Sequence, residues 1–294
     1  MAGVLSAEFP SAWQVPLREW TNAFVDRLVD DYSAAFDGVS SALLFALAQV
    51  ERALLSLPWW LVALALAALV WHATGRRWMN GALVLVALVL VGSFGLWPQT
   101  VTTLALMTLA SVACVIIGVP LGVLMARSAA FKAFLRPILD LMQTMPSFVY
   151  LVPVVMFFRL GNVSALFATI VYAIPPVIRL TDLGLRSVDR SLVEAAETAG
   201  ASEGQVLRYV RLPLALPTVA AGVNQTIMLA LSMVVLASMI GARGLGQEVL
   251  RGLQRGDVGL SLEAGLAIVL LAVILDRVTA GYGRRLDPDA EERG

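Results

Sequence analysis

Charged residues are scarce in this sequence. Asp, Glu, Lys and Arg make up only 14% of its 294 residues, whereas a soluble domain carries about 25%. Hydrophobic residues make up 59%, and the mean hydropathy is +0.82. A chain of this composition cannot cover a surface that faces water on every side, so a soluble globular enzyme is excluded.

Net charge, cysteine and lysine are also lacking. The 21 basic residues balance the 21 acidic ones, so no overall positive field attracts nucleic acid. The single cysteine, Cys114, excludes a disulfide framework and a multi-cysteine metal site. The single lysine, Lys132, lies outside any G-x-x-x-x-G-K-[ST] loop, which excludes a Walker-type ATP site. We therefore expect no catalytic residue, no metal site and no cofactor in this chain, and no cleaved signal peptide.

Long apolar runs dominate the rest of the sequence. A helix needs about 20 apolar residues to cross the ~30 Å hydrocarbon core of a membrane. Seven runs meet this requirement, and prolines at 146 and 153 are expected to kink the fourth. The sequence therefore predicts an all-α membrane protein with about seven transmembrane helices. The runs are residues 58–75, 79–97, 101–126, 138–158, 162–180, 215–240 and 259–281.

Residues 1–57 have a different pattern. Trp20, Phe24 and Tyr32 belong to a set of apolar residues that recurs every four positions, as is typical of an amphipathic helix. The apolar run Val39–Val50 is too short to span. We expect helices lying along the outer membrane surface, which serve as a docking element or pack as a strap against the first span. The next segment, residues 58–95, would hold two accessory spans.

Basic residues indicate the orientation of the spans, because Lys and Arg gather in cytoplasmic loops. Those that follow the first, third, fifth and seventh spans all fall on one side of the membrane. Arg159 and the group Arg243, Arg251 and Arg255 oppose this assignment. The balance predicts an external N-terminus and a cytoplasmic tail at residues 283–294.

Residues 187–213, between the fifth and sixth spans, are patterned as a rigid element that we call the knuckle. Capping-box spacings, in which Ser is followed three residues later by Glu or Gln, begin at Ser191 and Ser202. Gly200 stands where a helix C-terminal glycine is expected, and Pro213 is expected to stop the second helix. The knuckle is therefore predicted to be two short helices that meet at a glycine bend.

Polar residues inside spans are costly and are therefore candidates for a translocation path. One set falls at i, i+4 and i+7 on one face of the fourth span, and a second forms a stripe on the sixth. The same residues could instead hold neighbouring helices together through hydrogen bonds. The two sets are Gln143, Ser147 and Tyr150, and Asn224, Gln225, Met228 and Ser232.

The knuckle resembles a known family pattern. The segment Glu194-Ala195-Ala196, three residues, Gly200, nine residues and then Val210-Arg211-Leu212-Pro213 resembles the EAA loop of ABC importer permeases. Four further segments are similar to the glycine betaine/proline betaine permease subgroup, within a resemblance that covers residues 96–282. They are Gln143–Pro153, Leu214–Thr226, Ser238–Val249 and Glu263–Ile268.

The resemblance implies a type I ABC importer transmembrane fold over residues 96–282, in the inner membrane of a bacterium. It implies a permease without enzymatic activity, which forms the path for glycine betaine, proline betaine or a related quaternary amine. Its partners would be a second permease copy, two cytoplasmic ATPase subunits that hold ATP and Mg, and an external substrate-binding protein. The residues that would couple it to the ATPase are Glu194, Ala195, Ala196, Gly200, Leu212 and Pro213.

Two other functions remain open. An ion-coupled secondary transporter or channel would work without an ATPase, and a scaffold subunit would contain no path. An ion-coupled transporter is expected to hold a carboxylate near the membrane midplane. The acidic residues in or near the spans all lie close to an inferred span end, which favours an energy source outside this chain. They are Asp140, Asp182, Glu263 and Asp276.

Overall fold

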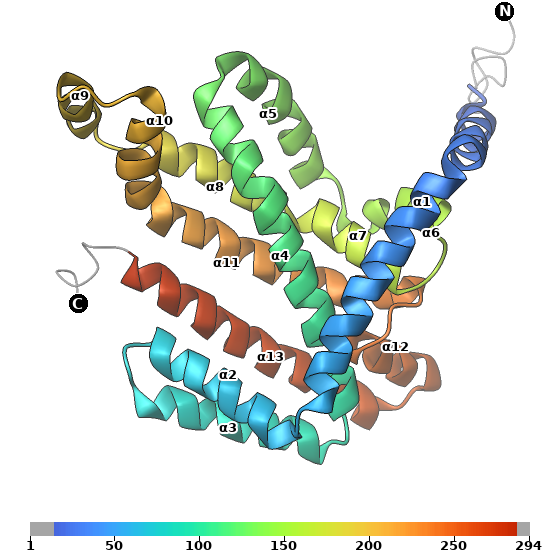
Figure 1. Cartoon of the computed structure of the whole chain (residues 1–294). Helices are drawn as coiled ribbons and strands as arrows, with labels where there is room; N and C mark the ends of the chain where they lie inside the picture. The colour runs from blue at the N-terminus through green and yellow to red at the C-terminus, as the bar shows by residue number, and fades with distance from the viewer. Residues whose placement is uncertain (1–14, 287–294) are drawn as a thin grey trace, which may run out of the picture.

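The computed structural model describes residues 15–286, and every regular element in this range is a helix. The remainder of the predicted N-terminal segment and tail, residues 1–14 and 287–294, lies outside the described residues. Figure 1 shows a bundle in which α11 (Leu212–Ala237) and α13 (Val258–Arg285) lie side by side and α4 (Trp97–Arg127) crosses them. These three helices form the frame that positions the knuckle.

Most of the predicted spans are present as long helices. Among the described residues, five helices are long and apolar enough to cross a membrane, or six if one bent pair counts as a single span. The predicted span 162–180 extends to Arg186, because α7 (Asn162–Ala173) continues into α8 (Pro175–Arg186) and prolines are tolerated in the first turn of a helix. The five helices are Leu17–Ser56, Trp97–Arg127, Asn162–Arg186, Glu203–Ile240 and Val258–Arg285.

The two accessory spans form helices that are shorter than predicted. The first, α2 (Trp59–Ala73), has 15 residues, and the second, α3 (Trp78–Ser93), has 16. Both pack against α13, and buried small residues such as Ala63 and Ala67 allow α2 to lie close to Ile274. They therefore widen the bundle on the side of α13 that faces away from α11 (Figure 1).

The prediction of separate surface helices at the N-terminus is wrong. Residues Leu17–Ser56 form one helix, α1, with a kink at Tyr32. Just after the kink, Phe36 stacks on Phe157 with ring centroids 5.1 Å apart. The run Val39–Val50 is therefore only the apolar middle of a helix that is long enough to span. Figure 1 shows α1 crossing the bundle obliquely, and it packs against α4 and α6.

The predicted fourth span is broken into two helices. The first is α5 (Ala129–Thr144), and a 3₁₀ turn, η3 (Ser147–Tyr150), leads into α6 (Leu151–Phe158). The two halves are bent by 112°. Met145 has an extended backbone because the ring of Pro146 disfavours the helical conformation in the residue before it. The expected proline kink is thus a complete break.

Helices α4, α8 and α11 approach one another closely through glycines. A Cβ added to Gly118 would clash with Val177 Cγ1, and one added to Gly122 would lie 2.7 Å from the carbonyl oxygen of Ile178. Gly222 of α11 approaches α8 from the other side in the same way. Small residues four positions apart allow this kind of contact between membrane helices. The helix that leads into the knuckle, α8, is therefore clamped on two sides.

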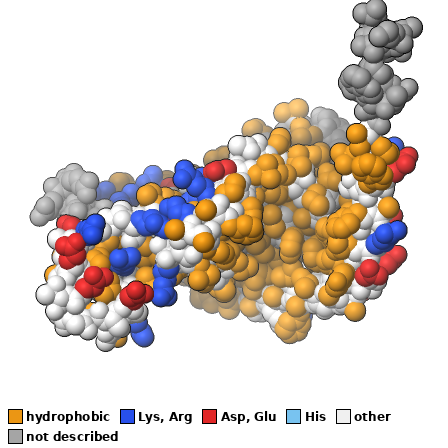
Figure 2. Space-filling model, turned by 90° about the horizontal axis from the view of Figure 1, so that it is seen from above, with side chains coloured by type: hydrophobic (Ala, Val, Ile, Leu, Met, Phe, Trp, Pro, Cys, Tyr) orange, Lys and Arg blue, Asp and Glu red, His pale blue; other side chains and the backbone are white. Residues whose placement is uncertain are grey.

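Charged side chains gather at the end of the molecule that carries the knuckle. The α2–α3 connection and the C-terminal end of α13 lie at the same end (Figure 1). Figure 2 shows blue and red side chains concentrated there, next to a broad hydrophobic region, with a smaller charged group near α1. The basic loops that the sequence assigned to one side are therefore together in space.

Candidate functional site

The knuckle is an ordered pair of helices joined at a glycine. Its first helix is α9 (Arg190–Thr198), and Gly200 follows with a positive φ of +87°, which an L side chain adopts only with strain. The Gly200 N–H donates to the carbonyl of Glu197 at 2.9 Å, and the next N–H donates to that of Ala196 at 3.0 Å. These bonds satisfy the last carbonyls of α9, so the predicted glycine bend is confirmed.

One of the two predicted capping boxes is present. Before α10 (Glu203–Val206), Ser202 and Gln205 satisfy each other's backbone N–H groups, as predicted. At α9 the prediction is wrong, because Asp189 caps the helix and accepts a bond from the Ser191 N–H at 2.9 Å. That backbone hydrogen bond lowers the pKa of the Asp189 carboxyl below its ordinary value.

The knuckle is continuous with α11 rather than separated from it. A π-helical turn, η4 (Leu207–Arg211), joins α10 to α11, and the Leu212 N–H donates to the carbonyl of Leu207. Pro213 lies just after the π-helical turn, inside the continuous helical run Glu203–Ile240. The prediction that Pro213 stops the second helix is therefore wrong. The second half of the knuckle is therefore the N-terminal end of a long helix of the bundle.

Most of the predicted coupling residues are accessible. In α9, Glu194 and Ala195 are exposed and Ala196 is half-buried, whereas Val193 anchors the helix and is buried. Gly200 and Pro213 are exposed and Leu212 is half-buried. The Glu194 carboxylate is not a cap as predicted, because it accepts a bond from Arg190 Nε at 2.8 Å. The knuckle therefore presents small and acidic side chains outward on a helix with one buried anchor.

Below the knuckle, a buried carboxylate ties three helices together. Asp182 of α8 pairs with Lys132 of α5 at 2.6 Å and with Arg186 at 2.7 Å. Arg186 also donates to the carbonyl of Met125 near the end of α4 at 2.8 Å. The sequence did not predict that these basic residues share one carboxylate. Of these contacts, only the i, i+4 spacing of Asp182 and Arg186 could have been found in the sequence.

Replacing Asp182 by asparagine is expected to destabilise the fold, because two cations would lose their anion in a place that water reaches poorly. The side chain of Asp182 is only 8% exposed, and the expected loss is about 2 kcal/mol, less than for a fully buried pair because both cations are partly exposed. Thermal unfolding in detergent measures it. The control is Asp140→Asn, which breaks a pair with Arg179 in which the aspartate side chain is 54% exposed and the arginine side chain 33%, and it is expected to lose under about 1 kcal/mol. Equal shifts in the two variants would contradict the prediction.

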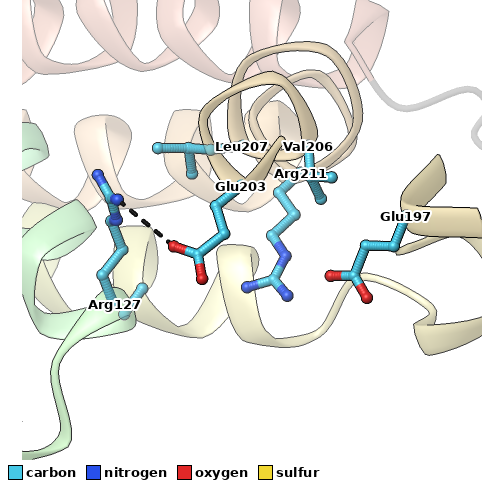
Figure 3. Close-up of a pocket in the computed structure, with 7 residues that line it drawn as sticks. Arg127, Glu197, Glu203, Val206, Leu207 and Arg211 are labelled. Carbon is cyan, nitrogen blue, oxygen red and sulfur yellow. Dashed lines mark ion pairs between the residues drawn. The ribbon is translucent and has the colours of Figure 1, made fainter. Parts of the chain in front are cut away.

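A polar cavity of about 200 Å³ lies at the base of the knuckle. Its wall is formed by the ends of α4 and α9, by α10 and by η4. Figure 3 shows four charged side chains from these elements in a row of alternating sign, with Arg127 paired to Glu203 at 4.0 Å. The row is Arg127, Glu203, Arg211 and Glu197.

The first set of path candidates does not share one helical face. Gln143 lies at the exposed end of α5, whereas Ser147 and Tyr150 belong to η3, beyond the 112° break. Tyr150 is buried, and its hydroxyl donates to the carbonyl of Met142. The prediction of a common face is therefore wrong, because the spacing holds only if the helix continues through the proline at 146.

The second set is divided between two sides of α11. Asn224 faces α13, where its Nδ2 donates to Asp276 at 3.3 Å and its Oδ1 accepts a bond from the Thr279 hydroxyl. Gln225 and Ser232 are exposed, and Met228 is half-buried. Asn224 therefore holds two helices together, and only the other side is open to a path. Within residues 15–286, no group of three or more His, Cys, Asp or Glu is placed to hold a metal ion.

Known proteins share both the sequence and the fold of this chain. Residues 118–290 match a family described as binding-protein-dependent transport system inner membrane component. The chain is 46% identical over 280 residues to the glycine betaine/proline betaine transport system permease protein ProW of Escherichia coli (strain K12), covering 95% of this chain and 77% of that protein. It is 40% identical over 282 residues to the glycine betaine/carnitine transport permease protein GbuB of Listeria monocytogenes serotype 1/2a (strain 10403S), covering 94% and 98%. The similarity therefore extends beyond residues 96–282, to which the sequence analysis confined it.

A solved structure shares the fold. The MetNI methionine ABC transporter in inward-facing conformations aligns with a TM-score of 0.58 at 24% identity, over 65% of this chain and 96% of that chain. At this identity the likeness concerns the fold alone. It confirms the predicted transmembrane fold of a type I ABC importer.

Proposed function

This chain belongs to the family of binding-protein-dependent transport system inner membrane components, and from that membership we propose that it carries glycine betaine, proline betaine or a related quaternary amine. It is a multi-pass protein of the inner membrane and the permease component of an ABC importer. The ATPase is a separate subunit, so the chain is not itself an enzyme. Relatives that align over most of the chain and are named for betaines support the choice of substrate.

The single observation that carries the mechanism is the continuity of the knuckle with α11. The α10 helix runs without a break into α11, and α9, with its buried Val193, joins α10 at the Gly200 bend, so a push on α9 would reach α11. We propose that Glu194, Ala195, Ala196 and Gly200 contact the ATPase, with Leu212 and Pro213 at the start of the moving helix. ATP and Mg would be held by that ATPase, which would be present in two copies.

A second copy of this chain completes the transporter in this proposal. The exposed side chains of Gln143, Gln225 and Ser232 would then line the path between the two copies, with Ser147 and Met228 at its edges. Tyr150 and Asn224 contribute by holding their helices in place, since both have hydrogen-bond partners within the chain.

The compartments follow from the charge distribution. We propose that the charged end with the knuckle and the C-terminus is cytoplasmic, and that the N-terminus and α12 (Leu245–Arg255) face the external binding protein. Residues 1–57 would form an anchoring or packing segment and 58–95 an accessory pair. Residues 96–282 would form the transport domain, and 283–294 a tail.

An ion-coupled transporter is the second candidate, and Asp276 is the observation that favours it. This carboxylate is hydrogen-bonded to Asn224 inside the bundle, the kind of position at which a transported ion could act. Proteoliposomes discriminate the two. With the ATPase and binding protein present, ATP alone is expected to drive betaine uptake. Uptake by this chain alone down an ion gradient would instead establish the second candidate.

Thiol accessibility tests the path. In a Cys114→Ala background, Gln225→Cys is expected to react with a charged thiol reagent, because a water-filled path lets the thiolate form. The rate should change when ATP is bound by the partner. The matched control is Val112→Cys, on the apolar side of α4 that contributes to a hydrophobic groove, and it should stay unreactive. If Gln225→Cys were also unreactive in every state, the proposed path would be wrong.

A further inference from the structure

We propose that Arg211 is a positioning residue that pairs with Glu197 when the ATPase engages the knuckle, and that this pair couples α9 to α11. The inference rests on the proposed function and adds to it a contact that would brace the bend at Gly200. In the structure described here, the two residues line the same cavity but form no ion pair.

Arg211 and Glu197 are the charged residues lining the cavities of the knuckle that form no ion pair with a described residue. A second cavity, of about 490 Å³, adjoins the first and shares Glu197 and Arg211 with it. Every other charged side chain that lines either cavity has a partner of opposite sign within residues 15–286. The pairs are Arg127 with Glu203, Arg186 with Asp182, and Arg190 with Glu194. Arg211 and Glu197 are therefore the one cation and the one anion that remain for each other.

The environment of Arg211 favours a partner. Its Nε is shielded from solvent and has no hydrogen-bond partner among the described residues. A buried donor without an acceptor is costly, and a charged one more so. Figure 3 shows the guanidinium between the carboxylates of Glu203 and Glu197, inside the cavity. The open volume gives the side chain room to move toward either one.

Of the two carboxylates, only Glu197 would join α9 to the helical run that contains α11. Glu203 precedes Arg211 along the same helical run and already pairs with Arg127 of α4, so a bond to it would join nothing new. Glu197 belongs to α9, which joins that run through the bend at Gly200 and also packs against α10 and η4. An Arg211–Glu197 pair would brace the bend and close the cavity, so the two knuckle helices would move as one body with α11.

Arg211 is the last residue of the π-helical turn η4. Wide turns of this kind frequently mark functional positions in helices. Arg208 occupies the same turn but is exposed, and its guanidinium lies 5.8 Å from the ring of Tyr209. It therefore serves as a matched control with the same charge, the same turn and no cavity.

Charge exchange tests the pairing. Arg211→Glu and Glu197→Arg are each expected to lower ATP-driven betaine uptake about tenfold while ATP hydrolysis continues, a typical coupling between sites. The double exchange should restore most of the uptake. Arg208→Glu with Glu197→Arg should restore none. A double exchange that is no better than either single variant would overturn the proposal.

A cross-link gives a second measurement that does not depend on charge. In the Cys114→Ala background, with copper phenanthroline and oxygen added as the oxidant, Glu197→Cys and Arg211→Cys together should form a disulfide faster when the full complex holds a non-hydrolysable ATP analogue. A rate that is independent of nucleotide, in a complex whose parent still shows ATP-driven uptake, would overturn the pairing alone. A parent complex without ATP-driven uptake would overturn the proposed function, and the pairing with it.

Discussion

Replacing Gly200 by valine is expected to abolish ATP-driven uptake in a chain that still folds and inserts. The space around Gly200 is open, so a side chain meets no atom within 4 Å, but the φ of +87° is one that a β-branched residue adopts only with strain. The cost is about 1–3 kcal/mol, confined to the bend. Relief of this strain would release the hydrogen bonds at the end of α9, and the knuckle would then yield under load.

Two further variants distinguish the effect of the backbone conformation at Gly200 from the effect of adding a side chain to the knuckle. Gly204→Val makes the same change in α10, where the added Cβ also meets nothing within 4 Å and φ is not positive, so it should keep most of the uptake. Gly200→Asn should keep more uptake than Gly200→Val, because asparagine tolerates the left-handed region. Uptake and ATP hydrolysis are measured together in proteoliposomes. Normal uptake by Gly200→Val would refute the role of the bend.

Replacing Gly122 by leucine is expected to prevent the stable assembly of the bundle. A Cβ at this position would lie 2.7 Å from the carbonyl oxygen of Ile178 and 2.5 Å from Thr181 Cβ. The backbone of α8 cannot move aside, because α11 packs against its other face through Gly222. Overpacking of a core usually costs about 1–3 kcal/mol, and a clash with backbone falls at or above the top of that range.

Expression and thermal unfolding in detergent measure this effect. Gly265→Leu is the matched control, because Gly265 lies inside the long helix α13 and an added Cβ there meets no atom within 4 Å. It should unfold near the temperature of the parent chain. A stable, transport-competent Gly122→Leu variant would mean that α4 and α8 do not need this close approach.

The predictions that held rest on local signals. The glycine bend at Gly200 and the capping box at Ser202 depend on residues within a few positions of one another, so chain geometry alone specifies them. The single-helix spans of α4, α11 and α13 depend only on the length of an apolar run. The family pattern of the knuckle was also contiguous, and it led directly to the fold and the transport function.

The predictions that failed assumed that a helix continues without a break, or that one residue caps a helix where a neighbouring residue can do so instead. The stripe from Gln143 to Tyr150 assumed an unbroken helix, but Met145 is extended before a proline. Asp189 caps α9 in place of Ser191, because the Asp189 carboxylate accepts a hydrogen bond from the Ser191 N–H. A sequence pattern indicates which bonds are available, and the folded chain selects among them.

The sequence by itself determined that this is a membrane protein, where α4, α11 and α13 lie, and that a helical element with a glycine bend joins two of the spans. Composition and short-range geometry carry this information, because an apolar run or a capping residue depends only on residues that are close to one another in the chain. Only the tertiary structure decided that Gly122 lies against α8, that Asp182 binds two cations, and that Arg211 and Glu197 face one cavity without touching. Those contacts join residues far apart in the chain, and their energies exist only once the helices have packed.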